Sequence, residues 1–481
     1  MKILLIRPPG IMGGEHSHAL QHPINLCWLA AVARAEGFDP AIVDYEVTPF
    51  DSGDFAAMLR DIKPAIVGLT AMTPTIDSAA RIAAEAKAAL PDVMTVIGGA
   101  HASILPVETL KQYPQFDVAV IGEGEVVFAE ICRDVRAGAL GAREIPSAMI
   151  RTESGYKGSP EKLAPRIDPG TLPLPARELL DLRLYKGAST PGLPRSNYNA
   201  TQLFTARGCP GKCIFCCSEH IFGRRVAHRP VAHVVAEIRD CMNRFGFDHF
   251  TIDNDTFTDD RARALEFCSA VSALGITWDC DTRVDRVDED LLRAMAASGC
   301  VKVAFGVETG SERVMKWIKK GITLDQVRNA FRWTRAAGML SCAFFIVGNH
   351  PDEEESDIEA TRRFIREIDP DLITVAIATP YPKTELESLM RNAGLLGELP
   401  WSAYGQSFQG KPFTRTRTMD ASRLKKVQSR LLRGFYLRPR YIMRRLSRIR
   451  SLGDALYWFG AGFQFLLYLF RRNKENAGMK M

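Results

Sequence analysis

Short apolar runs alternate with amphipathic segments along most of the chain, and this alternation constrains the fold more than any other feature. Between the runs of the first third, segments such as 26–36 and 79–90 carry apolar residues at helical spacing. Strands that are apolar throughout and alternate with helices are typical of a parallel sheet covered on both faces. We therefore expect an α/β domain with a doubly wound parallel sheet, whose strands cover residues 3–6, 41–43, 65–69, 94–97 and 118–121.

The same alternation returns between residues 197 and 389, with strands expected at 202–206, 250–253, 277–281, 302–307, 343–347 and 372–378. Consecutive strand–helix units of this kind favour a curved, barrel-like parallel sheet. An eight-unit barrel would need roughly fifty more residues than this segment has. The segment is therefore predicted to be a partial (β/α)6 barrel.

The length of 481 residues favours about three domains. Residues 142–194 interrupt the periodicity and are rich in Pro, Gly and charge, which indicates a connector. The predicted organisation is a first domain at 1–141, a linker at 142–194, the barrel at 195–392 and a helical, basic, amphiphilic region at 393–481.

Three loops of the first domain carry small or hydroxyl residues where a strand is expected to end: Thr70 and Thr73; Gly98, Gly99 and His101; and Gly122, Glu123 and Gly124. Open parallel sheets bind ligands outside the carboxyl ends of their strands. Glycine lets the backbone approach a ligand closely. Any one loop is explained by an ordinary tight turn, but three at one sheet edge favour a platform for a large ligand.

The loop after the first barrel strand carries three cysteines, Cys209, Cys213 and Cys216, in the spacing C-x3-C-x2-C. A structural zinc is held by four ligands, so it would also need Cys217 or His220. A cubane iron–sulfur cluster held by three thiolates keeps one iron open to a further ligand. The loop lies where α/β barrels do chemistry, at the carboxyl ends of the strands.

This cysteine pattern resembles the radical S-adenosylmethionine (SAM) enzymes. The Gly-Gly-x-His loop at 98–101, followed by Gly-Glu-Gly-Glu at 122–125, resembles the cobalamin-binding domain that precedes many radical SAM domains. The resemblance implies three cofactors: a 4Fe-4S cluster on the three cysteines, SAM and cobalamin. It implies SAM contacts at Phe215, Arg283, Gly306, Glu308 and Thr309, and cobalamin contacts at Gly13, Gly14, Thr70, Thr73, Gly98, Gly99, His101, Gly122, Glu123 and Gly124.

The first loop departs from cobalamin domains of the methionine-synthase type, because it has no Asp-x-His-x-x-Gly motif. In that type the motif histidine ligates cobalt, and many radical SAM relatives lack it. His16, His18 and His22 are available as ligands, although solvated loop histidines are the commoner case.

The resemblance implies a C-methyltransferase that acts on an unactivated carbon, takes electrons from a flavodoxin or ferredoxin, and methylates a small molecule or a lipid. The overall pattern is similar to lipid-tailoring members such as a hopanoid C-methylase. One alternative is an oxidative cyclase of the anaerobic Mg-protoporphyrin ester type or a ring-rearranging enzyme. An alternative of another class is a cobalamin-binding sensor without turnover.

Residues 423–450 are dense in Arg and Lys and contain no acidic residue. The apolar run at 455–470 that follows is shorter than the roughly 20 residues of a membrane-spanning helix. Two interpretations remain: a helical cap on the barrel, or an interfacial segment that docks on anionic lipid. The net charge of +6 is modest, and no nucleic-acid partner is expected. The N-terminus shows no export signal, so we expect a cytoplasmic protein, peripheral at the inner face of the membrane if the tail docks there.

Overall fold

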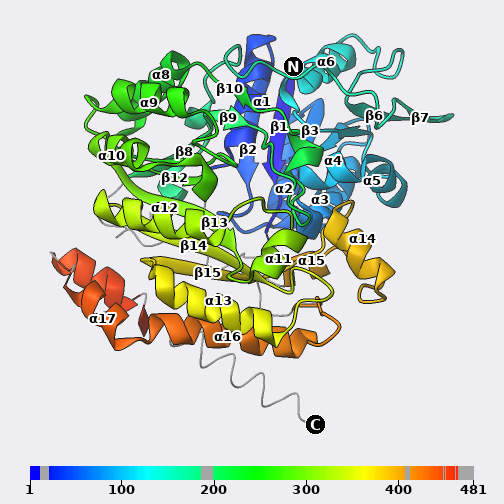
Figure 1. Cartoon of the computed structure of the whole chain (residues 1–481). Coiled ribbons are helices and arrows are strands. Elements are labelled where there is room, and N and C mark those ends of the chain that lie inside the picture. The colour runs from blue at the N-terminus through cyan, green and yellow to red at the C-terminus, as the bar shows by residue number, and fades with distance from the viewer. Residues whose placement is uncertain are drawn as a thin grey trace.

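The molecule consists of two α/β units and a helical C-terminal segment (Figure 1). The computed structural model describes residues 1–10, 21–185, 199–406, 412–447, 449, 451–460 and 462–463. In Figure 1 the blue and cyan first unit lies beside the green and yellow second unit, and the orange and red helices lie along the edge of the second.

The first unit is built on a sheet with the strand order β2-β1-β3-β4-β5-β6-β7. Its first five strands are parallel: β1 (Lys2–Arg7), β2 (Asp39–Asp44), β3 (Ile66–Thr70), β4 (Met94–Gly98) and β5 (Val118–Val120). Helices connect them: α1 (Ile24–Ala35), α2 (Ser52–Ile62), α3 (Ile76–Ala89), α4 (Ala100–Ile104), α5 (Pro106–Gln112) and α6 (Glu125–Arg136). Separate apolar cores on the two faces of the sheet confirm the doubly wound prediction.

Two short strands extend this sheet at the edge beyond β5. They are β6 (Ala148–Thr152) and β7 (Gly155–Lys157), and both pair antiparallel. The segment predicted as a connector from residue 142 thus begins with a hairpin. Because an edge hairpin of this kind is only half buried, it lacks the continuous apolar run that marks the other strands.

The second unit is a six-stranded, wholly parallel sheet with the order β15-β14-β13-β12-β11-β8. The strands are β8 (Ala200–Leu203), β11 (His249–Ile252), β12 (Thr277–Thr282), β13 (Cys300–Glu308), β14 (Leu340–Val347) and β15 (Leu372–Ile377). The covering helices include α8 (Val231–Phe245), α9 (Arg261–Val271), α10 (Glu289–Ala297), α12 (Leu324–Ala336) and α13 (Glu355–Ile368). The six-unit barrel predicted from the sequence is confirmed.

Side-chain caps start several of these helices at set positions. Asp260 accepts from the backbone of Arg263, and Asp288 accepts from the backbone of Leu291. Thr323 and Gln326 form a capping box at the start of α12. A cap satisfies backbone N–H groups that have no partner within the helix, so each helix begins at a defined distance from the strand before it.

The C-terminal helix α16 (Ala421–Tyr436) covers the open edge of the barrel at β15 (Figure 1). Leu424, Val427 and Leu431 lie in the same apolar core as the barrel strands. The side chain of Gln428 donates to the carbonyl of Val375 at 2.6 Å. The cap interpretation is therefore confirmed for this part of the tail.

Among the described residues, no helix is long and apolar enough to cross a membrane. Half of the apolar run at 455–470, residues 461 and 464–470, lies outside the described residues.

Candidate functional site

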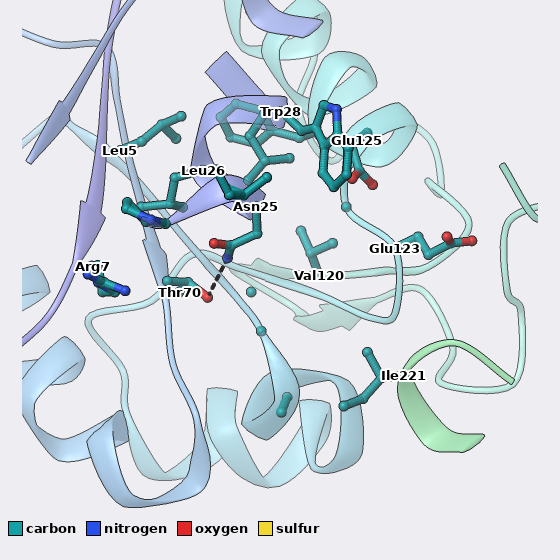
Figure 2. A pocket seen from close by; sticks show the side chains of 18 of the residues that line it. Leu5, Arg7, Asn25, Leu26, Trp28, Thr70, Val120, Glu123, Glu125 and Ile221 are labelled. Atoms are coloured by element: carbon teal, nitrogen blue, oxygen red, sulfur yellow. Dashed lines mark hydrogen bonds between the residues drawn. The ribbon is translucent and has the colours of Figure 1, made fainter. Parts of the chain in front are cut away.

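A cavity of about 370 Å³ lies at the carboxyl ends of β3, β4 and β5. Its wall includes most of the residues expected to bind cobalamin, namely Thr70, Gly98, Gly99, Gly122, Glu123 and Gly124. Figure 2 shows Thr70 hydrogen-bonded to Asn25 on one side of this space, with Val120, Glu123 and Ile221 on another. The sheet thus brings three loops that are distant in sequence to one opening.

Gly99 shows why glycine is needed in this wall. Its φ of +90° is a left-handed conformation, and a Cβ there would lie 2.7 Å from the carbonyl oxygen of Ala71. Gly98 differs, because a Cβ at that position would meet only ordinary contacts. The bare backbone leaves room for a broad ligand to lie against the strand ends, which fits a corrin ring.

Some expected cobalamin contacts lie elsewhere. Thr73 is buried in the short helix η1 (Thr73–Thr75), outside the cavity wall. His101 is also buried outside it, with its ring 4.9 Å from that of Trp401, and burial lowers its pKa to about 4. Gly13 and Gly14, together with His16 and His18, lie outside the described residues.

His22 lines the cavity, but its Nδ1 lies 2.9 Å from the hydroxyl of Thr201 in the barrel unit. Burial and nearby arginines lower the pKa of His22 to about 3. This ring is therefore neutral and fixed by a hydrogen bond across the two units.

The other wall of the cavity comes from the barrel unit, through residues that the sequence analysis did not single out. Gln202, Phe204, Arg207, Ile221 and Phe222 contribute to it. Arg207 is paired with Glu123 at 3.1 Å and with Glu125 at 2.6 Å. Glu123 therefore joins the two units as well as lining the cavity. The one sequence feature that could have pointed to Arg207 as a site residue is its position two residues before the first cysteine.

The three cysteines lie in the loop between β9 (Ala206–Arg207) and α7 (Ser218–Ile221). The backbone N–H of Gly211 points to the sulfur of Cys209 at 3.4 Å, and that of Ser218 points to the sulfur of Cys216 at 3.5 Å. A Cβ on Gly211 would lie 3.3 Å from the sulfur of Cys209 and 3.9 Å from that of Cys213. Glycine thus allows the loop to curve closely around sulfur atoms.

Burial raises the pKa of the Cys216 thiol to about 12, and it also raises the pKa of Cys213. A bound metal deprotonates a coordinating thiol, so an iron–sulfur cluster would supply the positive partner for these thiolates. No group of three His, Cys, Asp or Glu side chains in the described part of the chain converges to hold a single metal ion. In a cubane, each thiolate binds a different iron atom. His220, which a structural zinc could have used as its fourth ligand, has its Nε2 3.1 Å from the carbonyl oxygen of Lys383.

A second cavity, of about 350 Å³, lies in the mouth of the barrel. Gly306, Glu308 and Arg283, three of the expected SAM contacts, line it. Glu308 has a φ of +67° and pairs with the buried Lys320 at 2.7 Å. Arg283 donates to Asp285 at 2.9 Å and to the carbonyl of Lys320 at 2.8 Å. These contacts place charged groups of both signs at the mouth, and Lys320 was not among the expected site residues.

The remaining two expected SAM contacts do not reach this cavity. Thr309 is fully buried and its hydroxyl lies 3.1 Å from that of Thr361. Phe215 packs against the apolar cluster that contains Ile214 and Val314.

The two cavities share Phe204, Arg207, Phe222 and Asp253 in their walls. The opening of the first sheet and the mouth of the barrel therefore face each other across a common boundary. A ligand in one cavity would lie next to a ligand in the other.

Comparison with known proteins gives two family matches. Residues 13–132 match the B12 binding domain, and residues 203–365 match the radical SAM superfamily. The chain is 31% identical over 454 residues to the uncharacterized methyltransferase PH0819 of Pyrococcus horikoshii, which covers 92% of this chain and 94% of that protein. It is 29% identical over 392 residues to an anaerobic magnesium-protoporphyrin IX monomethyl ester cyclase of Rubrivivax gelatinosus, over 80% of this chain and 69% of the cyclase.

Among solved structures, the fold is similar to that of TsrM from Kitasatospora setae, a radical S-adenosylmethionine methyltransferase solved with cobalamin and a [4Fe-4S] cluster bound. The TM-score is 0.72, with 16% sequence identity and 99% of both chains covered.

Proposed function

This chain belongs to the radical SAM methyltransferases that carry a B12-binding domain, and on that premise we propose that it methylates an unactivated carbon of a small molecule. The cofactors of this family are a 4Fe-4S cluster, SAM and cobalamin. Bound together, they supply radical formation and a transferable methyl group. The observation that carries the proposal is the shared wall of the two cavities, because a substrate bound at that wall would lie within reach of both.

In this proposal the protein binds and orients the reactants. Cys209, Cys213 and Cys216 hold the cluster, and Thr70, Gly98, Gly99, Gly122 and Gly124 line the cobalamin side. Arg283, Gly306 and Glu308 face SAM, where the Arg283 guanidinium suits the SAM carboxylate. The buried Arg207–Glu123 contact keeps the two openings together. A flavodoxin or ferredoxin is the proposed electron donor.

The test is an anaerobic reaction of the enzyme, loaded with cluster and cobalamin, with SAM that carries an isotope-labelled methyl group. We expect 5′-deoxyadenosine together with label on a carbon of the product. Replacing Cys213 by Ala should abolish both, whereas Cys268→Ala, at a buried cysteine of α9, should leave both intact. Deoxyadenosine without methyl transfer would contradict the proposal.

A cyclase remains the second candidate, since the Rubrivivax relative bears that name. A cyclised product without label would favour it over a methyltransferase. Label in a product would exclude a sensor without turnover.

The finer proposal of a lipid or hopanoid-like substrate is supported by the C-terminal surface. Helix α17 (Pro439–Leu446) exposes Ile442, Met443 and Leu446, and Arg440 on the same helix is 85% exposed. Apolar side chains beside cationic ones suit an anionic bilayer surface. Sedimentation with vesicles of phosphatidylglycerol and phosphatidylcholine tests this. Met443→Asp should weaken binding, and Leu163→Asp, at an exposed leucine elsewhere, should not.

A further inference from the structure

The cysteine loop is held between two short helices of the barrel unit, α11 (Glu312–Trp317) and α14 (Glu385–Asn392). The backbone N–H of Ile214 donates to the carbonyl of Ile318, just after α11, at 3.2 Å. The carbonyl of Ile214 accepts from the N–H of Leu386 in α14 at 2.9 Å. Ile214 directly follows Cys213, so the surface that these two helices form lies beside the cluster ligands.

Exposed lysines lie on all three of these adjoining segments. They are Lys212 of the cysteine loop, Lys316 of α11, and Lys383, two residues before α14. Within the part of the chain that the structure describes, none of the three forms an ion pair. Of the neighbouring carboxylates, Glu385 is paired with Lys319 at 2.6 Å, and Glu312 is exposed on α11. The surface therefore carries more positive than negative charge.

Trp317, the last residue of α11, lies half-buried among these lysines. Its ring is stacked on that of His350, with 4.6 Å between the ring centroids, and the guanidinium of Arg313 lies 4.9 Å from it. Below the surface, Trp317 packs on the apolar cluster that also contains Ile214 and Phe215. An aromatic side chain at the centre, with Arg beside it and charged groups around it, is typical of a protein–protein contact.

We propose that this cationic patch, formed by Lys212, Lys316 and Lys383 around Trp317, is the docking surface of an acidic one-electron carrier protein. The carrier gives one electron to the cluster and is itself oxidised by one electron. Exposed cations without partners speed the approach of a negatively charged protein and orient it. Redox partners meet through small, transient interfaces, which suits a patch on two short helices. The inference rests on the proposed function, and it gives the proposed electron donor a place on this chain.

The experiment compares two reductants of the enzyme loaded with cluster and cobalamin, in the absence of substrate. Fully reduced flavodoxin has to dock, whereas dithionite is small enough to reach the cluster without a docking surface. Freeze-quench EPR spectroscopy follows the rate at which the reduced cluster appears. In the double variant Lys316→Glu with Lys383→Glu, we expect reduction by flavodoxin to be slower by about tenfold or more. Reduction of the same variant by dithionite should change little.

The matched control is the double variant Lys111→Glu with Lys426→Glu, at exposed lysines of α5 and α16. It changes the net charge by the same amount, and both reductants should reduce it like the wild type. Equal flavodoxin rates in the wild type and both double variants would overturn the proposal. Equal slowing of the patch variant with both reductants would overturn it too, because the lysines would then act on the cluster and not on docking.

Salt supplies a second measurement on the wild type. Reduction by flavodoxin should slow severalfold between about 50 and about 500 mM NaCl, because salt screens exposed charges. A rate that does not depend on salt would contradict an electrostatic contact. If the loaded enzyme methylates no product, the proposed function fails, while the comparison of cluster reduction still decides this inference.

Discussion

Two adjacent lysines show how strongly the environment sets a residue's role. Lys319 and Lys320 are neighbours, yet the side chain of Lys319 is 52% exposed and that of Lys320 is 9% exposed. Lys319 pairs with Glu385 at the surface, and Lys320 pairs with Glu308 inside the barrel mouth. Water screens the first pair and not the second.

Replacing each lysine by Met therefore has different expected effects. Lys320→Met leaves Glu308 as an unpaired buried charge and should lower the free energy of unfolding by about 3–5 kcal/mol. Lys319→Met should lower it by less than about 1 kcal/mol. Urea unfolding followed by circular dichroism measures both. Similar losses in the two variants would contradict the burial argument.

Gly99 carries a second residue-scale prediction. In Gly99→Ala the new Cβ would lie 2.7 Å from the Ala71 carbonyl in a left-handed backbone, so the loop must shift. We expect the cobalamin bound per chain, measured by visible absorbance, to fall at least severalfold. Gly138→Ala is the control, because this glycine also has a positive φ, of +64°, and a Cβ there would meet no atom within 4 Å. Full cobalamin binding in Gly99→Ala would show that this loop does not contact it.

At the scale of elements, α16 explains why an open six-stranded barrel has no bare edge at β15. The hydroxyl of Tyr436 accepts from the backbone N–H of Ile373 at 3.1 Å and donates to its carbonyl at 2.7 Å. Unpaired strand edges invite association with other chains, and a covering helix removes that hazard. Of the two interpretations of the basic tail, a helical cap and a lipid-docking segment, the cap therefore holds for α16.

Replacing a buried and an exposed leucine of this segment by alanine should show how much the packing of α16 stabilises the barrel. Leu431 is 2% exposed in the barrel core, so Leu431→Ala should lower the free energy of unfolding by about 2–5 kcal/mol. Leu437, just after the helix, is 46% exposed, and Leu437→Ala should change it by no more than about 0.5 kcal/mol. Denaturant titration of both proteins is the measurement. A stable Leu431→Ala protein would show that the helix adds little to the barrel.

At the scale of the whole molecule, buried arginines join the two units. Arg207 contacts Glu123 and Glu125 of the first unit and lies 4.8 Å from the ring of Trp28. Arg177, from the connector, pairs with Glu237 of α8 at 2.6 Å. Charged groups this well buried are costly to separate from their partners. The cavities consequently keep a fixed relation to each other.

Arg207→Met should weaken the contact between the two α/β units. Two carboxylates would lose their partner, and we expect about 3–5 kcal/mol less stability together with unfolding in two steps, one for each unit. Differential scanning calorimetry detects the split. Arg224→Met, which removes an exposed pair with Glu219, is the matched control and should unfold like the wild type. A single unchanged transition in Arg207→Met would show that other contacts hold the units together.

The sequence by itself determined the two α/β units, their strands to within a few residues, the cysteine loop and the glycine-rich strand ends. Those features depend on local periodicity and on motifs within a single loop, which a linear chain displays directly. The sequence could not show that the side chains of His101 and Thr309 are buried away from the cavities, because the direction of a side chain depends on how distant elements pack.

Only the tertiary structure decided that Arg207 and Lys320 belong to the site. Each owes its role to burial beside residues far away in sequence, and burial sets the strength of a charge's interactions. The shared wall between the cavities arises only when the two units pack against each other, and no local pattern encodes that contact.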